Sequence, residues 1–239
     1  MALLEVKSLD VRHGLLKAVR EVSLSIEKGD ILALVGANGA GKTTFLRSLA
    51  GAHAASGGSV AFKGEDVTHV SSHERVKRGI SLVPEGRKLF VEMSVHENLL
   101  LGRTSGRPGE WSVERILEVF PNLKPRLHAK TGHLSGGEQQ ATAIGRALMS
   151  NPELLMLDEV SLGLSPLVVD RVYASLTGLM ETGTTIVLVE QDLNRALRVA
   201  SRVVCMLEGR IVLERAAKDV TREEVTAAYF GLDRQRGAA

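Results

Sequence analysis

Residues 36–44 read Gly-Ala-Asn-Gly-Ala-Gly-Lys-Thr-Thr, and this stretch decides the fold. It fits the pattern G-x-x-x-x-G-K-[ST], with Gly36, Gly41, Lys42 and Thr43 at the spacing of a phosphate-binding loop. Glycines are needed because a triphosphate carries more charge than side chains alone can surround. The backbone must therefore approach it and point successive N–H groups inward. The stretch predicts a site for a nucleoside triphosphate.

The sequence on either side of this loop agrees with the prediction. Residues 31–35 form an apolar run typical of a strand buried on both faces, and residues 45–50 continue a helix that begins near Lys42. The positive end of this helix would face the phosphates, Lys42 would reach the β- and γ-phosphates, and the Thr43 hydroxyl would ligate Mg²⁺. A glycine-rich turn that binds nothing is the alternative, and the order of strand, loop and helix argues against it. The loop residues expected to hold the nucleotide are Gly36, Asn38, Gly39, Ala40, Gly41, Lys42, Thr43 and Thr44.

Composition sets further bounds. A chain of 239 residues can form one large α/β domain or a core with a smaller inserted subdomain. The 30 basic and 28 acidic residues leave a net charge of +2 with no basic tract, and aromatic residues are only 3%, so we expect no nucleic-acid partner. The single cysteine, Cys205, lies in an apolar run and is predicted to be a buried thiol.

The chain changes character along its length. Apolar and polar residues alternate near the N-terminus, which predicts antiparallel strands, whereas residues 91–150 read as helical segments and are predicted to form an inserted subdomain. We therefore expect one domain in three parts: residues 1–90 with antiparallel strands and the phosphate loop, residues 91–150 with the helices, and residues 151–239 with the rest of the core and a terminal helix. No apolar segment is long enough to cross a bilayer, so we expect the chain in the cytosol.

Two adjacent carboxylates follow the apolar run 154–157. Successive side chains on a strand point in opposite directions, so we expect Asp158 and Glu159 to have different roles. Asp158 is suited to the Mg²⁺ shell beside Thr43, and Glu159 to polarising the water that attacks the γ-phosphate. An acidic strand end is usually the start of a solvated loop, but its position after a phosphate loop favours catalysis.

The discriminating motif is Leu-Ser-Gly-Gly-Glu-Gln-Gln at residues 134–140. The order of phosphate loop, Leu-Ser-Gly-Gly-Glu and apolar strand with Asp-Glu resembles that of the ATP-binding cassette ATPases over nearly the whole chain. The resemblance implies an α/β fold of the P-loop NTPase type, with a mixed core sheet, an N-terminal antiparallel β-subdomain and an inserted helical subdomain. It also implies ATP and Mg²⁺ as cofactors.

Ser135, Gly136 and Gly137 lie at the start of a predicted helix and form a second anion site there. One γ-phosphate does not need two such sites in one chain. The resemblance therefore implies a head-to-tail dimer, homomeric or heteromeric, with ATP between one subunit's phosphate loop and the other's Ser-Gly-Gly segment. A capped helix after a glycine turn is the alternative, which explains Ser135 but not the whole heptapeptide.

Residues 83–87, 143–149 and 188–191 look most like the ATP-binding subunit of branched-chain amino acid importers, although urea or amide importers share parts of them. This resemblance implies an ATPase subunit on the inner face of the membrane that works with permease subunits and an extracytoplasmic substrate-binding protein. The rival is a soluble cassette ATPase that acts on nucleic acid or ribosomes. Such proteins usually carry a second cassette, a coiled-coil insertion or a basic arm, and this sequence shows none.

Four residues depart from the wider family pattern. His13 stands where an aromatic residue, usually Tyr, stacks on adenine, and Glu85 stands where a Gln usually senses Mg²⁺ and the permease. Gln191 replaces the His that usually contacts the γ-phosphate and is therefore a catalytic candidate beside Glu159. Val160 replaces a common Pro. A surface histidine, a solvated turn residue and a polar strand end are the respective alternatives for His13, Glu85 and Gln191.

Overall fold

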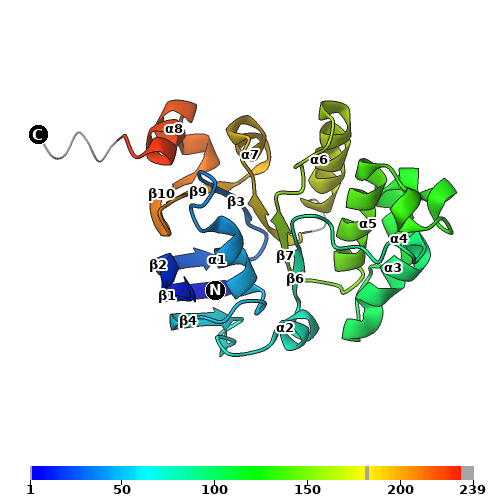
Figure 1. Ribbon diagram of the computed structural model, residues 1–239, viewed down its shortest axis with the longest axis horizontal. Coiled ribbons are helices and arrows are strands. Elements are labelled where there is room, and N and C mark those ends of the chain that lie inside the picture. The colour runs from blue at the N-terminus through cyan, green and yellow to red at the C-terminus, as the bar shows by residue number, and fades with distance from the viewer. Residues whose placement is uncertain (1, 181–182, 233–239) are drawn as a thin grey trace, which may run out of the picture. The chain divides into compact units, whose positions relative to one another are not determined.

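The computed structural model describes residues 2–180 and 183–232 (Figure 1). Its internal contacts define two compact units, one of residues 1–72 and 185–239 and one of residues 73–184. The boundaries expected at residues 90 and 150 stay a prediction. Among the described helices, none combines the length and the apolar character that crossing a membrane requires.

The first unit opens with an antiparallel sheet, as the alternating N-terminal pattern predicted. Its strands are β1 (Leu4–His13), β2 (Leu16–Ile26), β4 (Gly57–Phe62) and β5 (Glu65–Asp66), in the order β2-β1-β4-β5. The strand β1 pairs with β2 on one side and β4 on the other, and bulges interrupt both ladders. These bulges explain why the apolar alternation in β2 is clear only in its last residues.

The phosphate-loop strand β3 (Ile31–Val35) also belongs to the first unit, between β8 (Thr185–Val189) and β9 (Arg202–Leu207). Both neighbours run parallel to β3, whereas β10 (Arg210–Ala216) is antiparallel to β9, so the core sheet is mixed, as expected. Strands β3, β8 and β9 are almost wholly buried, whereas β10 is partly exposed. Helix α7 (Leu193–Val199) packs against β3 and helix α8 (Arg222–Phe230) against β9 and β10, while α1 (Lys42–Leu49) contacts β1 and β2. Cys205 is fully buried in this core, and burial raises the pKa of its thiol to about 11.

The second unit combines a parallel strand pair with helices. Strands β6 (Ile80–Val83) and β7 (Leu154–Asp158) pair in register from Ile80 opposite Leu154 to Val83 opposite Leu157. Its helices are α2 (Ser72–Arg78), α3 (Val95–Gly102), α4 (Val113–Val119), α5 (Gly136–Leu148) and α6 (Pro166–Met180). The helical character predicted for residues 91–150 is confirmed by α3, α4 and α5. Helix α5 lies close to α3, because Gly145 has no side chain to separate them.

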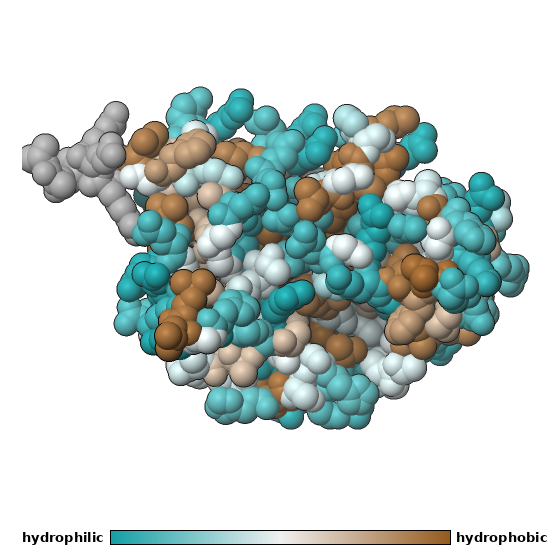
Figure 2. Space-filling view, in the orientation of Figure 1, coloured by the Kyte–Doolittle hydropathy of each residue, from teal (hydrophilic) through white to brown (hydrophobic). Residues whose placement is uncertain are grey.

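On the face that Figure 2 shows, polar residues predominate and the brown apolar residues lie in separate clusters among teal ones. Two pairs of adjacent large apolar side chains are exposed: Leu15 and Leu16 at the turn between β1 and β2, and Phe90 and Val91 in the segment after β6.

Candidate nucleotide-binding site

The phosphate loop leaves the end of β3 in a backbone conformation that favours glycine. Gly36 has a φ of 148°, and a Cβ atom there would lie 2.2 Å from the carbonyl oxygen of Met206. Gly41 has a φ of 102°, and its Cβ would lie 2.4 Å from the carbonyl oxygen of Ala18. At both positions a side chain would collide with fixed backbone. The loop turns sharply enough to present its N–H groups at the start of α1, as phosphate binding requires.

Lys42 is the first residue of α1, and its side chain is 4% exposed. Its Nζ donates to the carbonyl oxygens of Gly36 at 2.8 Å and Ala37 at 3.1 Å. The ammonium therefore lies inside the loop, where it can transfer these hydrogen bonds to phosphate oxygens. Thr43 and Thr44 follow in the same turn and are half-buried.

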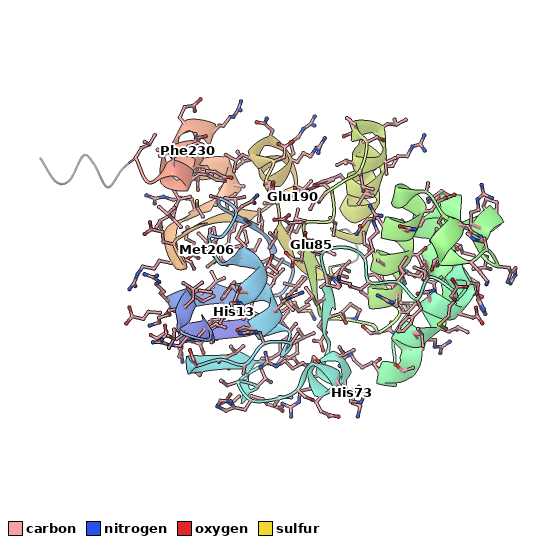
Figure 3. All side chains as sticks on the ribbon, viewed as in Figure 1. His13, His73, Glu85, Glu190, Met206 and Phe230 are labelled. Atoms are coloured by element: carbon pink, nitrogen blue, oxygen red, sulfur yellow. The ribbon has the colours of Figure 1, made fainter. Side chains whose placement is uncertain are left out.

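His13 ends strand β1 and lies beside this turn (Figure 3). Its Nε2 is 3.1 Å from the Thr44 Oγ1, and its ring centroid is 4.4 Å from that of His53, with the rings tilted by 49°. His53 Nε2 lies 2.9 Å from the Arg12 carbonyl oxygen, so it carries the proton of that hydrogen bond. The two imidazoles thus form a small exposed aromatic surface next to the phosphate loop. Sequence reasoning missed His53, because only the fold brings it beside His13.

Gln191 and Glu190 follow β8 at the same sheet edge as the phosphate loop. Leu34 pairs with Val189, so the two chain segments leave their parallel strands side by side. Gln191 is exposed, whereas Glu190 is only 1% exposed and its carboxylate accepts the Gln191 N–H at 3.3 Å (Figure 3). Sequence reasoning gave no role to Glu190. The available signal was a carboxylate directly after a buried apolar strand, the same signal that singled out Asp158.

In the second unit, Asp158 ends β7 and is 1% exposed, and Glu159 follows it half-buried. Glu159 lies outside the strand with a φ of +50°, so the alternation of side chains along a strand does not set its direction, contrary to the reasoning from sequence. A left-handed glutamate is a strained conformation of the kind that functional sites retain. Val160 is buried, and nothing in the structure explains why it replaces the proline of the family pattern.

Glu85 stands two residues after β6 and is exposed. Because β6 and β7 are parallel, their carboxyl ends meet at one edge, which carries Glu85, Asp158 and Glu159. The buried carboxylate of Asp158 offers the kind of hard oxygen donor that Mg²⁺ prefers.

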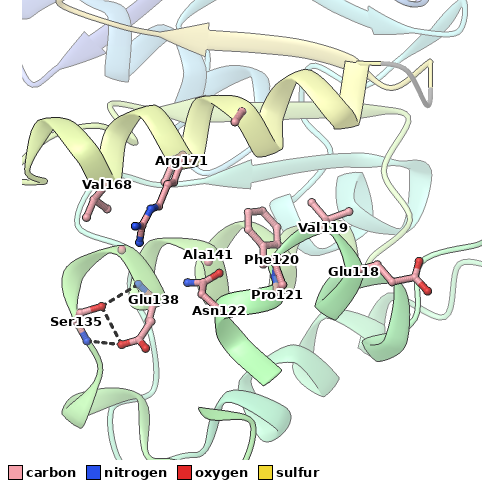
Figure 4. Close-up of a pocket in the computed structure, with 13 residues that line it drawn as sticks. Glu118, Val119, Phe120, Pro121, Asn122, Ser135, Glu138, Ala141, Val168 and Arg171 are labelled. Carbon is pink, nitrogen blue, oxygen red and sulfur yellow. Dashed lines mark hydrogen bonds between the residues drawn. The ribbon is translucent and has the colours of Figure 1, made fainter. Parts of the chain in front are cut away.

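Ser135 caps helix α5 in the second unit (Figure 4). Its N–H and hydroxyl both donate to a Glu138 carboxylate oxygen at 2.8 Å, and the Glu138 N–H lies 3.4 Å from the Ser135 Oγ. Burial by itself would raise the pKa of Glu138, but the hydrogen bonds from Ser135 and the Arg126 guanidinium hold it below its usual value. An approaching phosphate must compete with this internal carboxylate for the Ser135 hydroxyl.

Gly137 follows in the first turn of α5, and a Cβ there would lie 2.5 Å from the Val168 Cγ1 of α6. The Ser135–Gly137 segment therefore rests directly on α6. A cavity of about 720 Å³ opens beside it (Figure 4). Its apolar lining comes from α6, from Ala141 of α5 and from residues 119–121 at and after the end of α4, and Arg171 projects from α6 towards the Ser135 end.

Comparison with known proteins agrees with these features. The family model described as ABC transporter matches residues 19–161. A branched-chain amino acid transport ATP-binding protein of Pseudomonas aeruginosa, BraG, is 40% identical over 96% of this chain and 100% of its own length. A probable branched-chain amino acid transport ATP-binding protein of Archaeoglobus fulgidus, LivF, is 32% identical over 93% of this chain and 95% of its own. The crystal structure of an ATP-binding cassette of an ABC transporter in its ADP conformation shares 30% identity with a TM-score of 0.82, over 97% of this chain and 99% of that one.

The phosphate loop, the capped Ser-Gly-Gly segment and the acidic strand end define a P-loop nucleotide-binding protein. The chain belongs to the ATP-binding cassette ATPases of ABC transporters, whose members hydrolyse ATP. The fold and the family expected from the sequence are both confirmed.

Proposed function

We propose that this chain is the ATP-hydrolysing subunit of an importer for branched-chain or other hydrophobic amino acids, held on the inner face of the membrane by permease subunits. The observation that carries the proposal is the match to BraG along the entire length of that protein, joined to a complete phosphate loop in the structure. An extracytoplasmic binding protein would deliver the amino acid, and the permease would select it. An importer for urea or amides is the nearest alternative.

The proposed roles follow from the geometry within each unit. In the first, Lys42 and the loop N–H groups bind the phosphates, His13 contacts the base and Gln191 lies near the γ-phosphate. In the second, Glu159 orients and deprotonates the attacking water. Ser135, Gly136 and Gly137 complete the ATP site of a second cassette subunit.

Thr43 in the first unit and Asp158 and Glu85 in the second are the residues that we propose for Mg²⁺, which would neutralise charge that develops on the phosphates. Thr43 supplies a hydroxyl and Asp158 a buried carboxylate for this purpose. Closure of the dimer on ATP and its reopening after hydrolysis would supply the work of transport, because the closed state binds ATP more tightly than the open one.

Two measurements test this function. The tagged chain, purified from its own cells, is expected to bring membrane permease subunits with it and no RNA. The isolated complex, reconstituted in vesicles with its binding protein and ATP on the cassette side, is expected to accumulate leucine in preference to urea. Recovery of ribosomes or RNA in place of permease would contradict import, and urea uptake without leucine uptake would move the assignment to the urea importers.

A further inference from the structure

A set of polar contacts joins the segment 85–91, which follows β6, to helix α5 in the second unit. Arg146, in the last turn of α5, donates from Nη2 to the carbonyl oxygens of Arg87 at 3.3 Å and Lys88 at 2.8 Å. Its guanidinium also lies 5.8 Å from the centroid of the Phe90 ring. One arginine side chain of α5 thus contacts three residues of this segment, Arg87, Lys88 and Phe90.

A second arginine, Arg87 of the segment itself, contacts the other end of α5. Arg87 donates from Nη1 to Gln139 Oε1 at 2.9 Å, and Gln139 lies one turn after Ser135, whose carbonyl accepts its N–H at 2.9 Å. The Arg87 guanidinium also lies against Gly136, since a Cβ there would be 3.3 Å from Nη2. Arg87 therefore touches the residues that begin α5.

The far end of the segment is fixed through its backbone. Asn98, which is fully buried, accepts the Phe90 N–H at 3.1 Å and donates to the Phe90 carbonyl at 3.0 Å. Thr131, also fully buried, donates to the same carbonyl at 2.9 Å, and its own carbonyl accepts Gln139 Nε2 at 3.0 Å. The contacts close into a ring, while the Phe90 side chain remains 56% exposed.

The backbone of the segment is strained between these anchors. Gly86, Arg87 and Lys88 have φ values of 74°, 63° and 46°, and the left-handed region is unfavourable for the two residues that are not glycine. Such a conformation persists only where surrounding contacts determine it. Displacing the segment alone would break the contacts of both arginines with it, so moving the segment together with α5 costs less free energy.

We propose that Arg87 and Arg146 clamp the segment 85–91 to α5, so that its position sets the position of Ser135. This inference rests on the proposed function, in which Ser135 completes the ATP site of the second subunit. Arg87 and Arg146 are then positioning residues for hydrolysis.

The first test compares Arg146→Lys with Arg107→Lys in the purified full chain. Lysine keeps the charge, but its Nζ ends one bond short of the position of Nη2 and it has no planar guanidinium to lie over the Phe90 ring. Arg146→Lys is expected to lower kcat for ATP hydrolysis about tenfold and to leave KM for ATP within about twofold, because the phosphate loop is untouched. Arg107 is a matched control, since it is half-buried, donates to the Lys77 and Asn151 carbonyls and pairs with Glu153, away from the segment 85–91. Its variant is expected to keep the parent kcat.

The second test is a double-mutant cycle between Arg87→Ala and Gln139→Ala, with urea unfolding of each variant to show that it is folded. If the two side chains act as one contact, the double variant has about the kcat of the slower single variant. Multiplicative losses of kcat, or a folded Arg146→Lys with the parent kcat, would overturn the clamp. A parent chain that hydrolyses no ATP would instead contradict the proposed function itself.

Discussion

At the scale of single residues, the phosphate loop depends on the absence of a Cβ atom at its glycines. Gly41 and Gly39 both have positive φ values, 102° and 80°, but they differ in their surroundings. A Cβ at Gly41 would meet the Ala18 carbonyl oxygen at 2.4 Å, whereas nothing lies within 4 Å of a Cβ at Gly39. Alanine at the two positions therefore separates the free-energy cost of a side chain on a left-handed backbone from the cost of its collision with Ala18.

Gly41→Ala is therefore expected to lower the free energy of unfolding by about 1–3 kcal/mol more than Gly39→Ala, which is the range for overpacking. It should also weaken ATP binding, because Ala18 or the loop must move. Urea unfolding of both variants measures the difference. Equal losses of stability would mean that the loop absorbs the extra methyl group without strain.

His13 is expected to discriminate poorly between ATP and GTP. An imidazole offers less stacking area than the ring of Tyr, so the two dissociation constants should differ by less than about tenfold, or about 1.4 kcal/mol. Titration of both nucleotides tests this, with His13→Tyr expected to bind both more tightly. His73→Tyr is the control, because His73 is an exposed histidine of α2 in the other unit. A preference for ATP above tenfold in the parent would contradict the stacking argument.

At the scale of elements, three described helices begin with the same reciprocal cap: Ser94 with Glu97, Ser135 with Glu138, and Thr221 with Glu224. In the first, the Ser94 hydroxyl donates to the Glu97 carboxylate at 2.7 Å and the Ser94 N–H donates to it at 2.8 Å. These two hydrogen bonds lower the pKa of Glu97 below its ordinary value of 4.5. Ser94 is not among the residues proposed to bind or hydrolyse ATP, so its substitution tests the cap itself.

Ser94→Ala is expected to lower the free energy of unfolding by roughly 1 kcal/mol at pH 7, the usual value of an N-cap serine. The folded pKa of Glu97 is depressed, so its contribution is fully present above about pH 4.5 and is lost as the pH falls through the folded pKa. The difference between parent and Ser94→Ala should therefore shrink in urea unfolding below pH 4.5. A difference that stays constant with pH would show that the carboxylate takes no part in the cap.

The elements show how far the sequence could predict the structure. The strand Ile31–Val35 and helix α1 were predictable because the phosphate loop between them has a required geometry. The first half of β2 was not, since bulges break the alternation that marks a strand. In the site, the loop and the two acids were identifiable from local sequence, but the strained φ of Glu159 was not, because it depends on how the chain leaves β7.

At the scale of the whole molecule, one chain carries two helix starts that we propose bind phosphate, at Lys42 in the first unit and at Ser135 in the second. The Ser135 cap is filled by Glu138 of the same chain, and a phosphate from outside must displace it. Two such sites fit a head-to-tail dimer in which each ATP contacts both subunits. Contacts between two subunits leave no pattern in the sequence of one chain, apart from the motifs that form the two sites.

We propose that Glu159 activates water at an ATP site that two subunits share. This role is tested by ATP hydrolysis of Glu159→Gln, together with the molar mass of the variant by light scattering in the presence of ATP and Mg²⁺. We expect unchanged ATP binding, hydrolysis slowed by about 10² to 10⁴, the usual contribution of a general base, and an ATP-bound dimer that persists. Near-normal turnover would contradict this role of Glu159. A slow variant that binds ATP but forms no dimer, either with itself or with a cassette subunit that co-purifies with it, would contradict the shared site.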